Sequence, residues 1–320
     1  MTELSRHLDQ HSGLWGMTAY FNPIGYRRRL DNYRLFRAHL SIPLVTVELG
    51  LDGHYDLGEA DADILIRCDA CDILWQRERM LNLALAAVPG DCDKIARLDC
   101  DVIFEDPSWS IRASRELDDH VFVQLFTEAY DQPRGAIPGM PGFPDHARAW
   151  EGFANLWRSK QNPALIDRRI QAAGTRSRCA MGMAWAFRRE LHADVDIYDT
   201  CILGGAEHAM LAAACGLPDI VVDYQRMGAG RSRNYLDWAA RFHRLVDGTF
   251  GVVQGRIAHL WHGDIEHRGY ATRYKDFAIF DFDPVRDLAI NESGAWRWAS
   301  HDVKMRNYVR DYFASRREDG

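Results

Sequence analysis

The alternation between short apolar runs and segments of helical spacing in residues 14–126 most constrains how this 320-residue chain can fold. LWGMTAYF (14–21) and IPLVTVEL (42–49) are typical of buried strands, because they are short, rich in apolar residues and end at turn residues. Segments 25–40 and 72–88 repeat their apolar residues with the period of a helix. This order predicts an α/β fold with a mostly parallel sheet and helices on both of its faces.

Ligands of such sheets collect at the carboxyl ends of the strands, and two acids stand at one of these ends. The apolar run in KIARLDCDVIFEDPSW (94–109) leads into Asp99 and Asp101. Residues i and i+2 of an extended chain share a face, so the two carboxylates repel each other unless a cation lies between them. Hard divalent cations prefer oxygen ligands. The pair therefore predicts a divalent metal site.

Composition excludes several classes of protein. Apolar residues make up 47% and charged residues 27% of the chain, which indicates a folded globular protein. The net charge of −7 argues against a broad basic surface that coats nucleic acid. The seven cysteines form no second CxxC beside Cys68 and Cys71, so we expect reduced thiols and no zinc site. The start of the chain has no signal-peptide pattern and no run of about 18 apolar residues occurs, so we expect no membrane span and a cytoplasmic location.

The second half of the chain is organised differently. Residues 131–146 contain four prolines and three glycines, which predicts an extended loop able to act as a lid, and we expect a helix over 147–160. MGMAWAFRREL (181–191) is typical of a strand, and GGAEHAMLAAACG (204–216) of a helix entered through two glycines. Residues 276–320 carry no pattern that we interpret.

Two of these segments resemble known glycosyltransferases. A helix, an apolar strand and then DCD is the order in which GT-A type glycosyltransferases place their metal-binding DxD motif. Residues 181–214 resemble the acceptor-side segment of the beta-1,4-galactosyltransferase and polypeptide N-acetylgalactosaminyltransferase families, which leads into Gly-Gly-Glu-Asp. Glu207 stands where the galactosyltransferases have their general base, whereas Ala206 replaces the preceding acid. The resemblance covers roughly residues 14–126 and 180–275.

The resemblance implies one GT-A (Rossmann-like) domain over residues 1–320 with an elaborated C-terminal half. Residues 14–126 would bind the nucleotide sugar, 180–275 would serve the acceptor and the metal, and 276–320 would form an extension. The implied cofactor is Mn²⁺ or Mg²⁺, held by Asp99, Asp101 and His262, with His259 as a further candidate from HLWHGDIEHRGY.

The implied binding residues fall into two sets. The nucleotide-sugar set lies at strand ends, in WQRERMLN and after the histidines, and comprises Thr18, Ala19, Tyr20, Phe21, Asn22, Glu48, Arg79, Asn82, Cys100, Arg268 and Arg273. The acceptor set comprises Trp185, Gly204 and Gly205. Arginine suits the diphosphate because its planar fork fits phosphate oxygens.

The expected activity is metal-dependent, inverting transfer of a sugar from a nucleotide-diphosphate donor, with a UDP-sugar favoured, and Glu207 as the base. A retaining transferase is an alternative. A nucleotidyltransferase is another, although AYFNPIGYRRR (19–29) holds a single glycine where such enzymes carry a glycine-rich phosphate loop. A non-catalytic sugar-binding protein is the third. The acceptor stays open between a glycan, a protein side chain, a small metabolite and a modified nucleobase.

Overall fold

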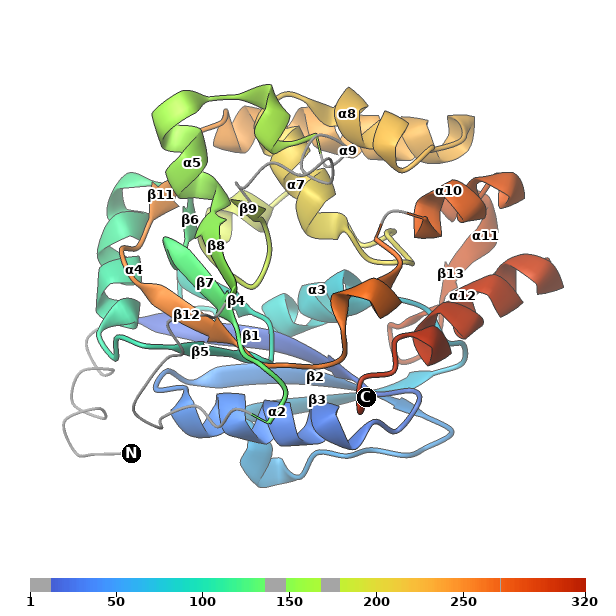
Figure 1. Cartoon of the computed structure of the whole chain (residues 1–320), viewed down its shortest axis with the longest axis horizontal. Helices are drawn as coiled ribbons and strands as arrows, with labels where there is room; N and C mark the ends of the chain where they lie inside the picture. Colours follow the sequence, from blue (N-terminus) through green and yellow to red (C-terminus); the bar gives the residue numbers. More distant parts are fainter. Residues whose placement is uncertain (1–12, 136–147, 168–178, 271) are drawn as a thin grey trace.

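A seven-stranded sheet forms the centre of the molecule in a computed structural model, which describes residues 13–135, 148–167, 179–270 and 272–320 (Figure 1). Its strand order is β3-β2-β1-β4-β10-β6-β11. The bounds are β1 Leu14–Phe21, β2 Leu44–Leu51, β3 Ile64–Ala70, β4 Lys94–Leu98, β6 Phe122–Gln124, β10 Ala184–Arg188 and β11 Gly251–Val252. Only β10 runs against its neighbours, β4 and β6. The structure therefore confirms the mostly parallel α/β fold, and it adds β3, which we did not predict.

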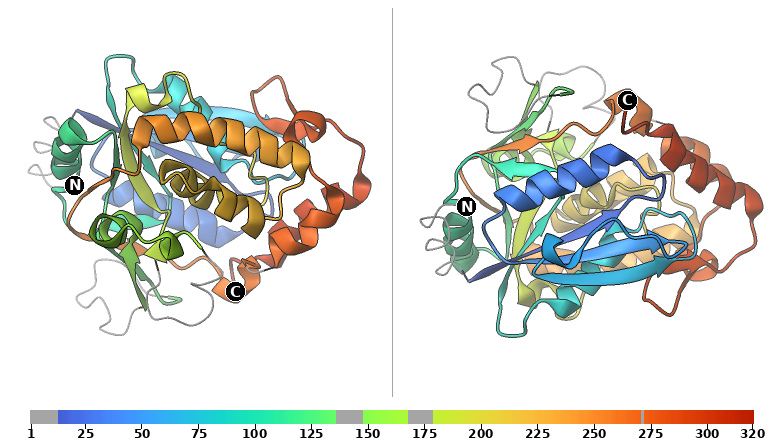
Figure 2. Two further views of the ribbon diagram at one scale, coloured as in Figure 1. Left: turned by 90° about the horizontal axis from the view of Figure 1, so that it is seen from above. Right: turned by 90° about the horizontal axis from the view of Figure 1, so that it is seen from below.

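Helices cover both faces of this sheet (Figure 2). One face carries α3 (Arg77–Ala87), α7 (Ala206–Ala214) and α9 (Ala229–Val246), whose apolar side chains join one buried cluster. The opposite face carries α2 (Arg27–His39) and the unpredicted α4 (Trp109–Asp119), which pack in a second cluster. Side chains of a strand alternate between these two clusters, because successive residues point to opposite faces.

A second sheet, β5-β12-β7-β8-β9, lies beside the first. Its strands are β5 Val102–Phe104, β7 Glu128–Asp131, β8 Arg148–Gly152, β9 Cys179–Ala180 and β12 Arg256–His259. The helix expected over 147–160 begins only at Phe153, as α5 (Phe153–Lys160), because residues 148–152 pair with β7 instead. The loop expected over 131–146 falls largely on 136–147, outside the described residues.

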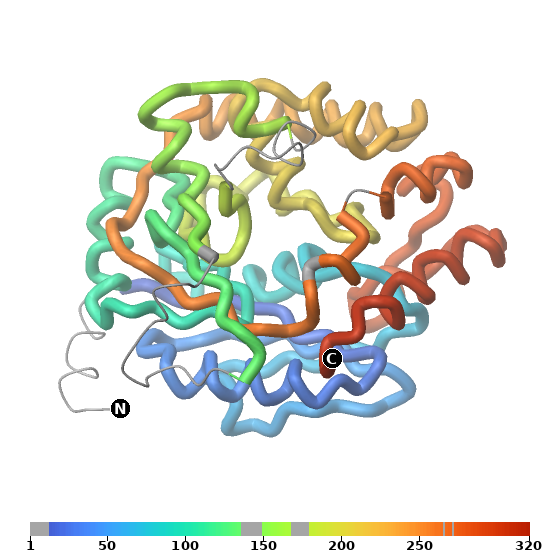
Figure 3. Tube along the Cα trace, in the orientation of Figure 1, coloured from blue at the N-terminus to red at the C-terminus, as the bar shows by residue number. Residues whose placement is uncertain are grey.

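The last part of the chain returns to the core; residues 276–320 are the part of it for which we made no prediction. Its elements are α8 Pro218–Tyr224, α10 Arg273–Phe277, α11 Pro284–Asp287, β13 Leu288–Ile290, β14 Trp296–Trp298 and α12 Val303–Ser315. The buried face of α12 includes Met305, Val309 and Phe313, which belong to the cluster formed by α3 and α7. Beyond α12 the chain runs back beside the segment that follows β12 (Figure 3).

Among the described residues, no helix has the length and apolar character needed to cross a membrane.

Candidate metal centre and active site

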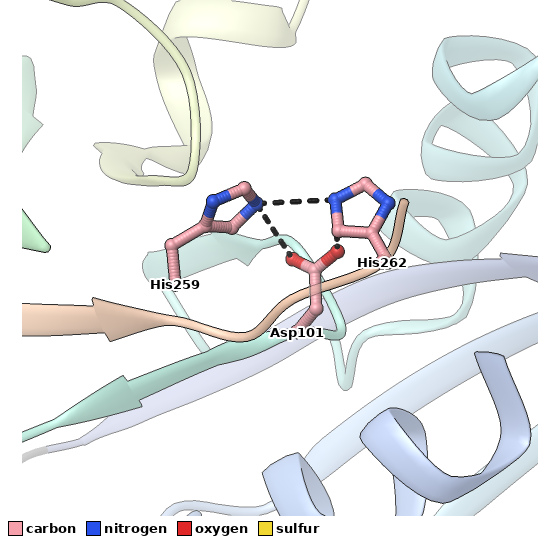
Figure 4. Close-up of side chains that lie close together, drawn as sticks. All are labelled: Asp101, His259 and His262. Atoms are coloured by element: carbon pink, nitrogen blue, oxygen red, sulfur yellow. Dashed lines mark hydrogen bonds and ion pairs between the residues drawn. The ribbon is translucent and has the colours of Figure 1, made fainter. Parts of the chain in front are cut away.

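Three side chains that are far apart in sequence meet where the two sheets adjoin. Asp101 lies in the turn between β4 and β5, at the carboxyl end of β4. His259 is the last residue of β12 and pairs in register with Val102 of β5, and Leu260 N–H donates to the Asp101 carbonyl at 2.8 Å. His262 follows three residues later. Pairing of β12 with β5 thus carries both histidines to the aspartate, as Figure 4 shows.

The ligand atoms of this cluster face one another. His262 Nε2 lies 3.2 Å from Asp101 Oδ2, and His259 Nε2 lies 3.9 Å from Asp101 Oδ1. The two Nε2 atoms are 3.2 Å apart. Two nitrogens bound to one metal at about 2.1 Å lie roughly 3.0–3.4 Å from each other, so the spacing fits a shared ion. Asp101, His259 and His262 form the group that could hold a metal among the described residues.

The electrostatics of the cluster also fit a cation. Asp101 Oδ1 is buried without a hydrogen-bond partner, an arrangement that costs free energy unless a ligand satisfies the oxygen. Burial opposes ionisation of Asp101, but His262, His259 and Arg268 outweigh it and lower the pKa of the carboxyl. Burial, with the nearby Arg268, lowers the pKa of His262 to about 4, so its imidazole is neutral near pH 7 and can offer a lone pair.

Neighbouring groups orient the two imidazoles. His259 Nδ1 lies 2.8 Å from Asp131 Oδ1, and Trp150 Nε1–H donates to the other Asp131 oxygen at 2.7 Å. Burial alone would lower the pKa of His259, but the hydrogen bond to Asp131 and the charge of Asp101 raise it. On His262, Arg268 Nη2–H donates to Nε2 at 3.0 Å. No pattern in the sequence points to Asp131, because this acid lies on a strand without a motif around it.

Asp99, which we expected beside Asp101 on the metal, pairs with Arg77 and is not one of the three clustered ligands. Arg77 Nη2–H donates to the Asp99 carboxylate, and Arg77 Nη1–H donates to Glu207 at the start of α7. Burial raises the pKa of Asp99 to about 6, an effect that Arg77 partly offsets. The extended geometry that would put both acids on one side ends at Leu98, since residues 99–101 form a turn.

Arg77 is the residue of α3 that reaches the site, whereas our prediction named Arg79 and Asn82. Arg79 Nε–H donates to the Gly294 carbonyl, and its guanidinium lies over the ring of Trp296. Asn82 bonds to the backbone of Ile197 at both ends of its amide. Helix positions two apart differ by about 200° around the axis, so Arg77 and Arg79 point in opposite directions. The charge pattern of RER alone does not tell which of them faces the sheet edge.

A cavity of about 330 Å³ opens at the carboxyl ends of β1 and β2. Its polar wall includes Tyr20, Asn22 and Glu48 from our nucleotide set, together with Asp56 and His54. Tyr20 O–H and the Asn22 amide both donate to Asp56, at 2.8 and 2.9 Å. Glu48 Oε1 accepts the Leu57 N–H at 3.0 Å, while Oε2 is buried without a hydrogen-bond partner. The structure thus brings three predicted residues to one cavity.

Other residues that we predicted to bind the nucleotide sugar are part of the buried core. Thr18 Oγ1–H donates to the Leu98 carbonyl at 2.8 Å, and Ala19 and Phe21 pack in the main cluster. Cys100 packs beside Tyr20 and precedes Asp101 in the chain.

On the acceptor side, Trp185 is buried against Phe122, with its Nε1–H donating to the Met181 carbonyl at 2.8 Å. Its indole therefore faces the core. Gly204 and Gly205 form the left-handed turn that starts α7, and the Arg273 guanidinium lies against both. The structure brings these glycines, Arg273 and Glu207 to the same end of α7.

Comparisons with known proteins add little to these observations. No protein-family model matches the chain, and no curated protein matches it. Solved structures similar to it include glucosyl-3-phosphoglycerate synthase from Mycobacterium tuberculosis in complex with Mn²⁺, UDP-glucose and phosphoglyceric acid. The two sequences are 11% identical, the match covers 93% of this chain and 90% of that chain, and the TM-score is 0.41. A putative nucleotide-diphospho-sugar transferase from Desulfovibrio desulfuricans is 12% identical over 95% and 97%, with a TM-score of 0.34. The 4-diphosphocytidyl-2C-methyl-D-erythritolsynthase of Anaerococcus prevotii is 10% identical over 79% and 90%, also at 0.34. At these values the comparisons say nothing about activity, so function is argued from the site.

Proposed function

We propose that this protein is a metal-dependent glycosyltransferase that moves a sugar from a nucleotide-diphosphate donor to an acceptor hydroxyl with inversion. The observation that carries the proposal is the meeting of Asp101, His259 and His262 at the carboxyl edge of the sheet, with Asp101 Oδ1 buried and without a hydrogen-bond partner. Residues 14–126 would bind the donor and residues 180–275 would supply the histidines and the base. We take the whole chain as one domain and favour a UDP-sugar and a cytoplasmic location.

The chain's own residues would hold Mn²⁺ or Mg²⁺. One aspartate oxygen and two imidazole nitrogens suit Mn²⁺ better than Mg²⁺, which prefers oxygen ligands. Asp99 would approach the ion only after leaving Arg77, so Asp101, His259 and His262 form the primary set. When bound, the ion neutralises the charge that develops on the nucleoside diphosphate as the glycosidic bond breaks.

Nucleotide binding is assigned to the cavity beyond β1 and β2. Its polar wall, which includes Tyr20, Asn22 and Asp56, could bond a base or ribose. Cys100, the neighbour of Asp101 in the chain, packs beside Tyr20 of the cavity wall, so we propose that a nucleotide bound there extends its diphosphate toward the metal cluster. Arg268, which is hydrogen-bonded to His262, would bind phosphate oxygens bidentately.

Glu207 is proposed to take the proton from the acceptor hydroxyl. It stands in the first turn of α7, and the guanidinium of Arg77 joins it to Asp99. That shared contact places the proposed base near the DCD turn, which a displacement at the anomeric carbon requires. Arg77 would hold the carboxylate in place, and the turn at Gly204 and Gly205 sets the start of the helix that carries it.

The test is hydrolysis of nucleotide sugars by the purified protein without an acceptor. We expect release of nucleoside diphosphate from at least one of UDP-glucose, UDP-galactose, UDP-N-acetylglucosamine and GDP-mannose in Mn²⁺, and none in EDTA. D101N should lower the rate at least about 100-fold, whereas D118N, an exposed acid paired with Lys94, should leave it unchanged.

Other outcomes decide between the alternatives. Release that continues undiminished in EDTA would overturn the metal-dependent mechanism. Pyrophosphate formation from a nucleoside triphosphate and a sugar phosphate would identify a nucleotidyltransferase. With an acceptor in hand, NMR of the anomeric configuration would separate inversion from retention. Binding of a nucleotide sugar with no turnover in any metal would indicate a sugar-binding protein.

A further inference from the structure

Each histidine of the metal cluster has a second ring nitrogen, Nδ1, and a different part of the chain lies beside it in each case. A metal-bound histidine nearly always donates its other ring N–H to a carboxylate, a carbonyl or water, which fixes the ring and raises its basicity. For His259 this partner is Asp131, at 2.8 Å from Nδ1. For His262 the Nδ1 atom faces Glu318 Oε1 at 3.9 Å, within reach of a direct hydrogen bond after a small rotation of the ring.

Glu318 is a charged residue with no exposed surface, although it lies in a short segment beyond α12. Its Oε1 accepts from Arg29 Nη2 at 2.8 Å and from Arg316 Nε at 2.5 Å, and Arg29 Nε pairs with Oε2. A buried carboxylate is costly unless it is paired and hydrogen-bonded, so these two arginines hold it firmly. Both carboxylate oxygens are thus fixed beside the imidazole.

The backbone of this segment is fitted to the residue next to His262. Gly263 has φ +88°, and a Cβ there would lie 2.9 Å from the Arg316 carbonyl and 3.2 Å from Glu318 Cα. The neighbouring Asp319 accepts the Arg28 N–H at 2.8 Å, which caps the start of α2. Asp319 therefore docks the segment without facing His262, and Glu318 is the member that faces the imidazole.

We propose that Glu318 is a positioning residue of the metal site, which orients His262 through Nδ1 as Asp131 orients His259. The segment beyond α12 then contributes one residue, Glu318, to the metal site and is not only a packed end of that helix. This inference rests on the proposed metal site, and it assigns a role to a segment that no motif in the sequence indicated. With Asp131 and Glu318 each holding one imidazole through Nδ1, the Nε2 lone pairs of His259 and His262 would both point to one ion.

The test measures metal affinity directly. Titration calorimetry with MnCl₂ on wild-type protein, E318Q, D131N and D319N gives dissociation constants without any need for turnover. Loss of an outer-shell partner costs about 10- to 100-fold in metal affinity, so we expect that loss in E318Q and in D131N. D319N, which weakens the docking contact to the start of α2 but leaves Glu318 and its two arginines in place, should bind Mn²⁺ within twofold of wild type. The visible spectrum of the Co²⁺ complex should change in E318Q and not in D319N, because the ring orientation alters the ligand field.

Each result separates the possibilities. If wild-type protein binds neither Mn²⁺ nor Co²⁺, the proposed function itself falls. If wild type binds and E318Q matches it in affinity and spectrum, Glu318 has no role at the metal. Equal losses in E318Q and D319N, with unchanged Co²⁺ spectra, would show that the segment acts only by docking, and would also overturn the inference. Should E318Q fail to fold, E318D keeps the charge near Arg29 while withdrawing it from the ring, and the same loss is expected.

Discussion

Replacing Arg268 by glutamine should change metal binding and nucleotide binding in opposite directions. Arg268 Nη2–H donates to His262 Nε2 at 3.0 Å, and this nitrogen lone pair is the one a metal ion would take. The side chain is 9% exposed, so water does not replace a lost partner freely. Without nucleotide, the guanidinium therefore competes with the ion for His262 and also repels it.

The magnitude follows from the bond that must be given up. A hydrogen bond to a charged group contributes about 1.5–3 kcal/mol, and each 1.4 kcal/mol is about tenfold in an equilibrium constant. R268Q should therefore bind Mn²⁺ about 10- to 100-fold more tightly in the absence of nucleotide. The same variant should bind UDP about 10- to 100-fold more weakly in saturating Mn²⁺, because it lacks the bidentate contact to phosphate.

Calorimetry on one protein preparation measures both effects. MnCl₂ is titrated first, and UDP is then titrated into the Mn²⁺-saturated protein. R27Q is the matched control, since the Arg27 side chain is 88% exposed on α2 and pairs only with Asp31 in an i,i+4 contact. Weaker Mn²⁺ binding in R268Q would refute the competition, and unchanged UDP binding would remove Arg268 from the diphosphate site.

Three further predictions concern the base, a buried histidine and the glycine beside His262. E207Q should lower the rate of sugar transfer by about 10²- to 10⁴-fold while UDP binding by calorimetry persists, and a rate equal to wild type would remove the base assignment. Burial lowers the pKa of His192 to about 4, so its contribution to the free energy of unfolding is present above the ordinary pKa of 6.5 and is lost as the pH falls toward 4. Between pH 7 and pH 4, the free energy of unfolding measured with urea should therefore fall by about 3 kcal/mol less in H192L than in wild type. Equal falls in the two proteins would contradict the lowered pKa of His192. G263A should lower Tm and weaken Mn²⁺ binding more than G53A does. Both glycines have positive φ, but only a Cβ at Gly263 would meet backbone atoms. Equal effects of the two substitutions would count against close packing of Gly263 on the segment beyond α12.

The fold was predictable where a local pattern decides the structure. The periods of residues 14–21, 25–40 and 42–49 predicted β1, α2 and β2 within a few residues of their observed ends. The two glycines before Ala206 predicted the start of α7 correctly, because only glycine enters the left-handed turn freely. The strand β8 was missed, since its pairing with β7 is a long-range contact that overrides local preference.

The sequence allowed us to predict which residue types form the site, but not which of them contact one another. Asp101 and the two histidines come together as the resemblance implied, yet their encounter depends on β12 pairing with β5, more than 150 positions away in the sequence. Asp99 could not be separated from Asp101 by spacing alone, because the turn after Leu98 removes the strand geometry that the argument assumed. Glu318 lies in a segment without any motif, so only the folded chain shows it beside His262.

The balance of buried charge gives an independent reason to expect an anionic ligand here. Arg268 and Arg273 are 9% and 7% exposed, and no carboxylate of the described residues lies within ion-pair distance of either. Arg273 instead donates to Tyr312 Oη at 2.8 Å, and the Nε atoms of both arginines are buried without a hydrogen-bond partner. A buried cation without a negative partner costs free energy, and these two guanidiniums are held by neutral groups and tyrosine rings, so their surroundings favour an anionic ligand. A diphosphate would satisfy that preference, and the same arrangement predicts that inorganic pyrophosphate with Mn²⁺ raises the Tm of wild-type protein more than that of R268Q.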